Sequence, residues 1–159
     1  MIYWFIGQPS HGKTTLAKEF KKELDQIGEI SIHIDGDDLR RIFGNSYNKE
    51  NFTKEYRIEQ TERLQRFVSH IADQRITVIV STVNPYREVR DKFRYSREDV
   101  VEIFVHRSGK TEREHYNVVD FELPIFESGN EVYSIDTTDS TVEESMEILK
   151  NTLTACNRF

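Results

Sequence analysis

The chain has 159 residues, of which 36% are hydrophobic and 31% are charged, and its formal net charge is −6. This length suits one domain over 1–159 with a sizeable core, and no run of about twenty apolar residues could span a membrane. The negative charge excludes a general attraction to nucleic acid or to an anionic surface, so any binding of phosphate must be local.

Cysteine and histidine usage excludes two further classes. The single Cys156 rules out an internal disulfide, and the five histidines show no spacing of metal ligands, which argues against a zinc site. The N-terminal apolar run is too short for a signal peptide and lacks a basic leader. We therefore expect a cytoplasmic protein.

The N-terminal stretch combines a predicted strand with a phosphate-binding pattern. Residues 2–6 are apolar or aromatic and are followed by glycine, which is typical of a buried parallel strand. Residues 7–14 fit the pattern G-x-x-x-x-G-K-[ST], and residues 16–24 have helical spacing. The loop therefore joins a strand to a helix N-terminus, whose dipole favours an anion.

The fixed positions of this loop have distinct chemical roles. Gly7 and Gly12 allow backbone torsions that turn successive N–H groups toward a phosphate. Lys13 would reach the outer phosphates of ATP, and Thr14 would hold Mg²⁺. We predict that the whole loop binds ATP, through Gly7, Gln8, Pro9, Ser10, His11, Gly12, Lys13, Thr14 and Thr15.

The second predicted strand, over 30–34, ends in acidic residues. Asp35, Asp37 and Asp38 follow it around Gly36, before a short helix expected over 38–43. Because ligands gather beyond the carboxyl ends of parallel strands, these carboxylates should lie beside the phosphate loop. A base linked to magnesium is needed there, although one of the carboxylates could instead cap the helix.

A long helix is expected from 53 to about 74. Its apolar stripe consists of Leu64, Phe67, Val68 and Ile71. Extending the stripe backward by steps of three or four reaches Gln60 and Arg57. Because inward polar groups need partners, we favour ligand contacts for these two residues over a solvated face.

The second half of the chain continues the alternation. Strands are expected over 76–81, 100–105 and 131–135, and helices over 85–93, with Pro85 in the first turn, and 142–153. Thr141 and Glu144 resemble a capping box that is one residue short. The alternation predicts an α/β protein with three layers around a five-stranded parallel sheet. Together with the phosphate loop, this is the P-loop NTP hydrolase/kinase fold.

Five segments resemble the adenylylsulfate kinase family, which uses ATP to phosphorylate the ribose 3′-hydroxyl of adenosine 5′-phosphosulfate. They are 7–15, 35–40 (Asp-Gly-Asp-Asp-Leu-Arg), 52–63, 78–91 with its Asn-Pro-Tyr-Arg, and the weaker 116–124. The resemblance covers most of the chain. The second and fourth segments, jointly with the phosphate loop, are much more specific than the loop alone.

The resemblance implies catalytic and metal-binding roles. Asp37 falls where the family has the base that approaches the substrate hydroxyl and orders Mg²⁺, so the predicted metal ligands are Thr14 and Asp37. Lys13 and Asp35 complete the predicted catalytic group. Asp35 is the next candidate for the base.

The resemblance also implies an acceptor site. Arg40, Arg57 and Gln60 fall where the family contacts the phosphosulfate and the ribose, with Gln60 in place of the usual asparagine. Phe52 and Tyr116 fall where two phenylalanines clamp the adenine. Two further substrate-binding residues are predicted in the Asn-Pro-Tyr-Arg run: Asn84, which stands where the family usually has serine, and Pro85.

The chain departs from the family between 105 and 116, where it is shorter and lacks the Asp-x-Lys-Gly-Leu-Tyr lid segment. We expect poor closure over ATP there, with slow turnover or background hydrolysis. Two alternatives stay open: a related kinase for another nucleotide or small-molecule hydroxyl, and a non-catalytic nucleotide-binding module. The expected partner is a small-molecule nucleotide, without nucleic acid or membrane, and a homodimer stays open.

Overall fold

The computed structural model describes residues 1–43, 53–109, 117–126 and 131–159. The strands in these ranges are β1 (Ile2–Ile6), β2 (Ser31–Asp35), β3 (Thr77–Ser81), β4 (Val100–His106) and β5 (Val132–Asp136). The helices are α1 (Lys13–Gln26), α2 (Gly36–Ile42), α3 (Lys54–Ala72), α4 (Arg87–Tyr95) and α5 (Val142–Ala155). Apart from α2 followed by α3 and β4 followed by β5, strands and helices alternate, in the order that the sequence predicts.

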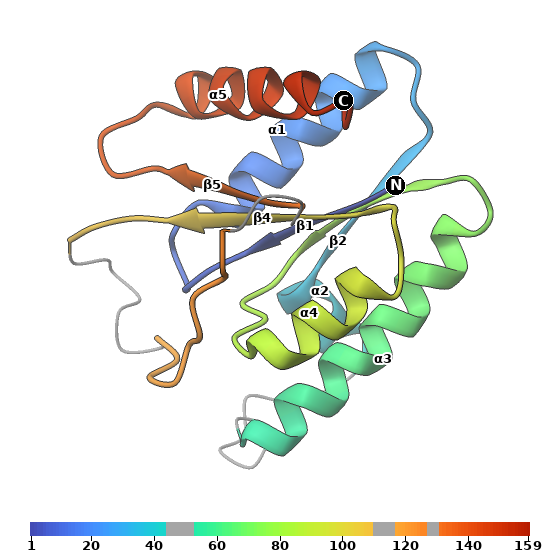
Figure 1. Ribbon diagram of the computed structural model, residues 1–159, viewed down its shortest axis with the longest axis vertical. Coiled ribbons are helices and arrows are strands. Elements are labelled where there is room, and N and C mark those ends of the chain that lie inside the picture. Colours follow the sequence, from blue (N-terminus) through green and yellow to red (C-terminus); the bar gives the residue numbers. More distant parts are fainter. Residues whose placement is uncertain (44–52, 110–116, 127–130) are drawn as a thin grey trace.

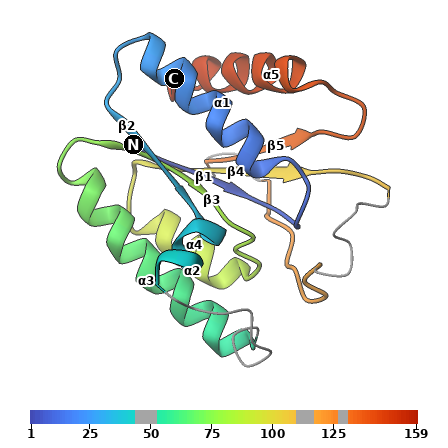
Figure 2. The same ribbon diagram turned by 180° about the vertical axis from the view of Figure 1, so that it is seen from behind.

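The five strands form one parallel sheet in the order β2-β3-β1-β4-β5. Helices α1 and α5 cover one face of the sheet, and α3 and α4 cover the other (Figures 1 and 2). Because every strand runs in the same direction, the ends that carry the phosphate loop and the acidic segment lie at one edge. The predicted three-layer α/β fold is confirmed.

The central strand β1 shows why the apolar run is nearly continuous. Tyr3 and Phe5 pack toward α1 and α5, whereas Ile2, Trp4 and Ile6 pack toward α3 and α4. Successive side chains of a strand point to opposite faces, and both faces of this sheet are covered by helices. A polar residue in β1 would therefore be buried on either face.

The apolar stripe of α3 differs from the prediction at one position. Phe67 is 47% exposed, whereas Val68 and Gln65 are buried. The row that faces the sheet follows four-residue steps through Leu64, Val68 and Ala72, which turns Phe67 outward. Gln65 turns toward α4 instead, where its Nε2 donates a hydrogen bond to the Val89 carbonyl oxygen at 3.0 Å.

Two predicted helix starts also need correction. Helix α4 begins at Arg87, so Pro85 lies before its extended N-cap residue Tyr86 and outside the first turn. The capping box of α5 is complete. Thr141 Oγ1 accepts from the Glu144 backbone N–H at 3.2 Å, and the Glu144 carboxylate accepts from the Thr141 N–H at 2.8 Å. Among the described residues, no helix is long and apolar enough to cross a membrane.

Candidate nucleotide and acceptor site

The phosphate loop follows β1 directly and depends on two glycines with positive φ. Gly7 has φ +139°, and a Cβ atom on it would lie 2.1 Å from the Val105 carbonyl oxygen of β4. Gly12 has φ +94° and caps the N-terminus of α1. The loop can therefore approach β4 only because residue 7 has no side chain.

The Lys13 side chain lies within the loop. The residue is 8% exposed, and its Nζ donates a hydrogen bond to the Gln8 carbonyl oxygen at 2.6 Å. A buried ammonium group at a helix N-terminus creates a local positive potential in a chain of negative net charge. This arrangement can bind the phosphates of a nucleotide.

The Asp35 carboxylate joins the loop to the neighbouring strand ends. Its Oδ2 accepts from Thr14 Oγ1 at 2.7 Å and from Ser81 Oγ at 2.7 Å. Its Oδ1 accepts from the backbone N–H groups of Asp37 at 2.9 Å and Asp38 at 3.4 Å, which makes Asp35 the N-cap of α2. Burial alone would raise the pKa of Asp35, but these four hydrogen bonds outweigh it and lower the pKa.

The sequence interpretation missed two residues behind Asp35. Ser81 ends β3 opposite Asp35 in the parallel register, so the convergence of strand ends could have indicated it. His33 Nε2 lies 2.9 Å from Ser81 Oγ. Since the hydroxyl gives its proton to Asp35, His33 Nε2 must carry a proton and act as the donor. Burial lowers the pKa of His33, which favours the neutral imidazole with its proton on Nε2.

Asp37 has a different environment from Asp35. It lies in the first turn of α2 with a side chain that is 56% exposed, and its Oδ1 pairs with Arg40 Nη1 at 3.1 Å. The exposed carboxylate can meet a substrate, whereas the Asp35 oxygens already accept hydrogen bonds from the protein. The catalytic roles of both residues and the metal-binding role of Asp37 stay predictions.

Arg57 and Gln60 both lie half-buried near the start of α3. Burial lowers the pKa of Arg57, and the charges of Arg40 and Asp120 and the hydroxyl of Tyr86 act on it from nearby. Burial and a hydrogen bond to Asp120 raise the pKa of Tyr86. The charge of Arg40 contributes to the lowered pKa of Arg57, so both guanidinium groups belong to the same side of the site, which suits an anionic acceptor.

Asn84 and Pro85 lie in the loop between β3 and α4. Asn84 is buried with φ +41°, and its carbonyl oxygen accepts from Arg90 Nη1 at 2.8 Å. Arg90 is itself buried and pairs with the Glu102 carboxylate of β4 at 3.2 Å. The conformation of this loop is therefore held from inside the protein. Phe52 and Tyr116 lie outside the described residues, so the adenine clamp stays a prediction.

The chemistry of the residues beside the loop fits Mg²⁺. Thr14, Asp35 and Asp37 offer hydroxyl and carboxylate oxygens, which this cation prefers. Within the described ranges, no group of three or more His, Cys, Asp or Glu residues could hold a metal ion. Mg²⁺ does not need such a group, because one or two protein ligands suffice when phosphate oxygens and water complete its shell.

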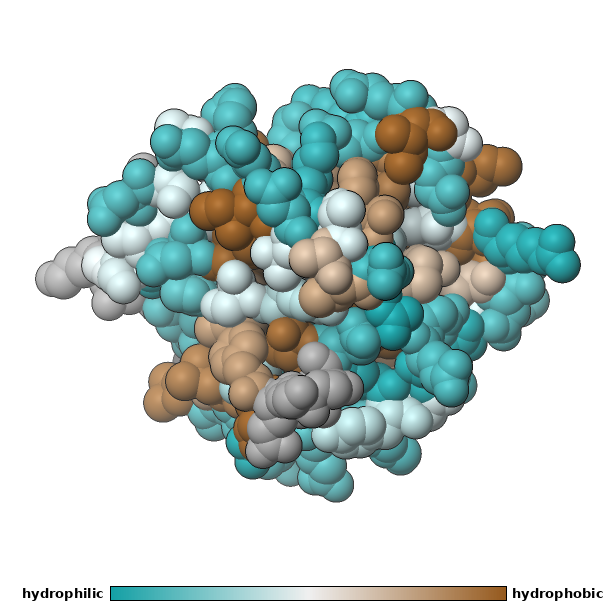
Figure 3. Space-filling view, turned by 45° about the horizontal axis from the view of Figure 1, so that its top comes forward, coloured by the Kyte–Doolittle hydropathy of each residue, from teal (hydrophilic) through white to brown (hydrophobic). Residues whose placement is uncertain are grey.

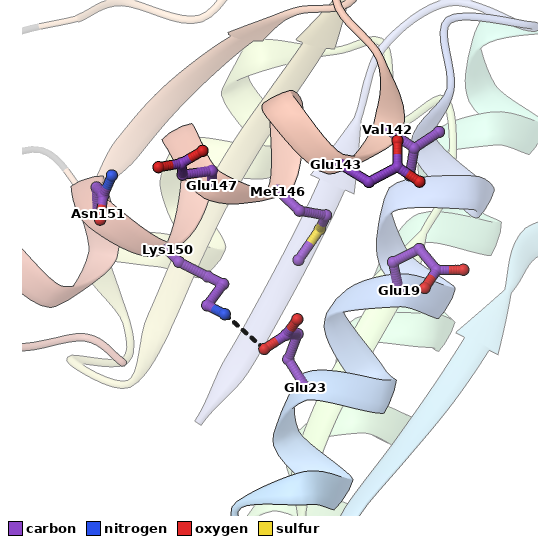
Figure 4. A pocket seen from close by; sticks show the side chains of 8 residues that line it. All are labelled: Glu19, Glu23, Val142, Glu143, Met146, Glu147, Lys150 and Asn151. Carbon is purple, nitrogen blue, oxygen red and sulfur yellow. Dashed lines mark hydrogen bonds and ion pairs between the residues drawn. The ribbon is translucent and has the colours of Figure 1, made fainter.

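A groove of about 340 Å³ lies between α1 and α5, away from the predicted site residues (Figure 4). It is lined by Glu19, Glu23, Val142, Glu143, Met146, Glu147, Lys150 and Asn151. The Lys150 ammonium group pairs with Glu23 across it at 2.6 Å. None of these residues is a predicted site residue, so the groove does not belong to the phosphate-binding edge.

The face of the protein shown in Figure 3 carries hydrophilic and apolar groups side by side.

The fold and the phosphate loop together define a P-loop nucleotide-binding protein of the three-layer α/β class. Within this class, the chain belongs to the adenylylsulphate kinase family, whose family model matches residues 1–116. The predicted family is thereby confirmed.

Three comparisons show which proteins the chain is similar to in sequence or in fold. An adenylyl-sulfate kinase of Picosynechococcus sp. is 38% identical over 103 residues, covering 64% of this chain and 56% of that protein. The cytidine diphosphoramidate kinase of Campylobacter jejuni is 30% identical over 105 residues, covering 65% and 59%. The structure of a Mycobacterium tuberculosis APS kinase in complex with AMPPNP and APS has a TM-score of 0.76 at 20% identity, covering 96% of each chain. The alignments span about half the length of the first curated relatives, 51–52%.

Proposed function

We propose that this protein is an ATP-dependent kinase that phosphorylates the 3′-hydroxyl of adenosine 5′-phosphosulfate. The observation that carries the proposal is the hydrogen bond of Thr14 to Asp35, which sets the phosphate loop against α2 with its Asp37 and Arg40. A phosphate donor in the loop and a hydroxyl acceptor beside α2 would then meet. Membership of the adenylylsulphate kinase family supports this assignment.

ATP would bind through the backbone N–H groups of the loop and the ammonium group of Lys13. Thr14 donates its hydroxyl proton to Asp35 at 2.7 Å, so the oxygen lone pairs stay available to a cation. Thr14 and Asp37 would hold Mg²⁺, with Asp35 behind them. When bound, this cation neutralises negative charge on the phosphate oxygens.

In the proposed reaction, Asp37 accepts the proton of the acceptor hydroxyl as that oxygen bonds to the γ-phosphorus. The bond between this phosphorus and the ADP oxygen breaks, so the products are the phosphorylated acceptor, ADP and one proton. Lys13 stabilises charge on the transferred group. Asp35 holds Thr14 and α2 in place and takes no proton, because hydrogen bonds already satisfy both of its oxygens.

On the acceptor side, Arg40 and Arg57 would bind the phosphosulfate anion, and Gln60 the ribose. Phe52 and Tyr116 would stack on the adenine. Asn84 and Pro85 would line the same pocket, and Arg90 would keep their loop in shape through its bond to the Asn84 carbonyl oxygen.

A second candidate is a kinase for another nucleotide. The guanidinium groups of Arg40 and Arg57 recognise charge rather than a particular base. In addition, a cytidine diphosphoramidate kinase is among the relatives. This candidate keeps the same phosphate loop and the same Asp37, and differs only in the acceptor pocket.

A coupled assay for ADP release tests the proposal. We expect release from Mg–ATP to depend on adenosine 5′-phosphosulfate and to saturate with it. Release that responds to cytidine diphosphoramidate alone would favour the second candidate. Binding of ATP without transfer to either acceptor would indicate a non-catalytic nucleotide-binding module.

A further inference from the structure

Residues 117–126, which we call the strap, connect the two halves of the candidate site (Figure 1). The strap is tied to the phosphate loop near its start and to the loop before α4 near its middle. The proposed function assigns ATP to the first of these loops and the acceptor to the second. The strap therefore offers a physical path between two binding sites.

The tie to the phosphate loop is a two-point pairing made by one side chain. Gln8 Nε2 donates to the Val118 carbonyl oxygen at 2.8 Å, and the Val118 N–H donates to Gln8 Oε1 at 2.9 Å. Because Val118 is buried, its N–H and carbonyl groups could not easily replace these hydrogen bonds with bonds to water. The backbone carbonyl of the same Gln8 accepts from Lys13 Nζ at 2.6 Å.

The tie to the acceptor side is made by Glu122. Its N–H donates to the Pro85 carbonyl oxygen at 2.9 Å, and its carboxylate accepts from the Arg87 N–H at 2.7 Å. Its carbonyl oxygen accepts from Arg90 Nη2 at 2.7 Å. The strap is thus attached to the end of the Asn84–Pro85 loop and to the guanidinium group that supports it.

Asp120 lies between these two ties. Its carboxylate raises the pKa of Tyr86, and its charge also acts on the pKa of Arg57, so Asp120 lies near both side chains. A shift of the strap at Val118 would therefore reach the predicted anion site through Asp120.

We propose that Gln8 is a positioning residue that couples nucleotide in the phosphate loop to the geometry of the acceptor site through the strap. A phosphate bound in the loop draws the Lys13 ammonium group toward itself, so binding alters the hydrogen bond that this group now makes to the Gln8 carbonyl oxygen. The paired carboxamide transmits this change to Val118. This inference rests on the proposed function.

Hydrogen exchange measured by mass spectrometry tests the coupling. The parent and Gln8→Leu, which keeps the size but loses both hydrogen bonds, are compared without nucleotide and with Mg–ADP at saturation. Gln65→Leu is the matched control, because it removes another buried carboxamide bond to a backbone carbonyl, at 3.0 Å from Val89. Gln8→Glu serves as a second variant, since it keeps the acceptor for the Val118 N–H and loses the donor.

In the parent and in Gln65→Leu, we expect Mg–ADP to slow exchange in the strap by about tenfold, the equivalent of one to two neutral hydrogen bonds. In Gln8→Leu this slowing is lost, and in Gln8→Glu it is reduced. The proposal would be overturned if Mg–ADP slowed exchange in the strap equally in Gln8→Leu and in the parent. It would also be overturned if Mg–ADP left the exchange rate of the strap in the parent unchanged. Calorimetry of Mg–ADP binding distinguishes these results from a failure of the proposed function. If the parent binds no Mg–ADP, the proposed function fails; if it binds Mg–ADP, the exchange data test the coupling alone.

A kinetic measurement distinguishes coupling from a structural role. Relative to the parent, we expect Gln8→Leu to raise KM for adenosine 5′-phosphosulfate about tenfold while kcat changes less than about threefold. A proportional loss of kcat with an unchanged acceptor KM would contradict the proposed coupling.

Discussion

Thr14 Oγ1 and Asp35 Oδ2 are joined by a hydrogen bond of 2.7 Å that ties the start of α1 to the end of β2. Ser81 at the end of β3 binds the same carboxylate oxygen at 2.7 Å. Three elements that are distant in sequence are therefore assembled around one carboxylate. This assembly fixes the phosphate loop relative to α2, the helix that carries the predicted base.

Asp35→Asn should destabilise the fold, because a neutral amide replaces a carboxylate that accepts four hydrogen bonds. We expect a loss of about 1.5–3 kcal/mol in the free energy of unfolding, measured by urea denaturation. Asp37→Asn is the matched control. Its ion pair with Arg40 is largely exposed, so that change should stay within about 0.5 kcal/mol. Equal losses in both variants would contradict the structural role of Asp35.

Lys13→Ala should weaken ATP binding, since the variant lacks the ammonium group held within the phosphate loop. We expect a loss of about 1.5–3 kcal/mol, roughly tenfold to more than a hundredfold in Kd, by equilibrium titration with Mg–ATP. The control is Lys22→Ala on the exposed part of α1, where Lys22 pairs with Glu19 at 2.6 Å. Unchanged affinity in Lys13→Ala would remove the nucleotide site from this loop.

Gly7→Ala should be much more damaging than Gly28→Ala. Both glycines have positive φ, which costs a residue with a side chain about 1–2 kcal/mol. Only Gly7 has a neighbour in the way, the Val105 carbonyl oxygen at 2.1 Å from the added Cβ, and this overlap adds about 1–3 kcal/mol. Thermal unfolding of both variants measures the difference, and equal melting temperatures would contradict the close approach of the loop to β4.

Stability should fall as the pH drops below about 6.5, the ordinary pKa of histidine. His33 has a lowered pKa in the folded protein because of its burial, so protons bind more tightly to the unfolded chain. The stabilisation is complete above the ordinary pKa and is lost as the pH falls through the lowered one. His11, whose pKa burial and Lys13 also lower, contributes in the same direction. His33→Gln should flatten part of this dependence in denaturation curves between about pH 7 and 5, whereas identical slopes would contradict a half-buried, neutral His33.

The sequence predicts the fold well because its strongest signals are local. The apolar run at 2–6, the glycines at 7 and 12 and the apolar strand at 77–81 each specify an element without distant information. The outward turn of Phe67 was missed, because three-residue and four-residue steps along a helix are difficult to separate before the packing partner is known.

The candidate site was predicted less completely, because its contacts are long-range. The sequence placed Asp35 beside the phosphate loop and ranked it behind Asp37 as the base, but it did not predict that Asp35 holds the loop and α2 in place. Their difference depends on hydrogen bonds from Thr14 and Ser81, which are 21 and 46 residues away from Asp35. The pairing of Gln8 with Val118 spans 110 residues and leaves no pattern in the sequence.

Transfer of the γ-phosphoryl group from labelled Mg–ATP to adenosine 5′-phosphosulfate tests the central claim most directly. In the parent protein, we predict label on the ribose 3′-oxygen of the acceptor. Asp37→Asn should form this product about a hundredfold more slowly, because it lacks the base for the hydroxyl proton. Label found only in inorganic phosphate, or equal rates of product formation in the parent and Asp37→Asn, would contradict the account.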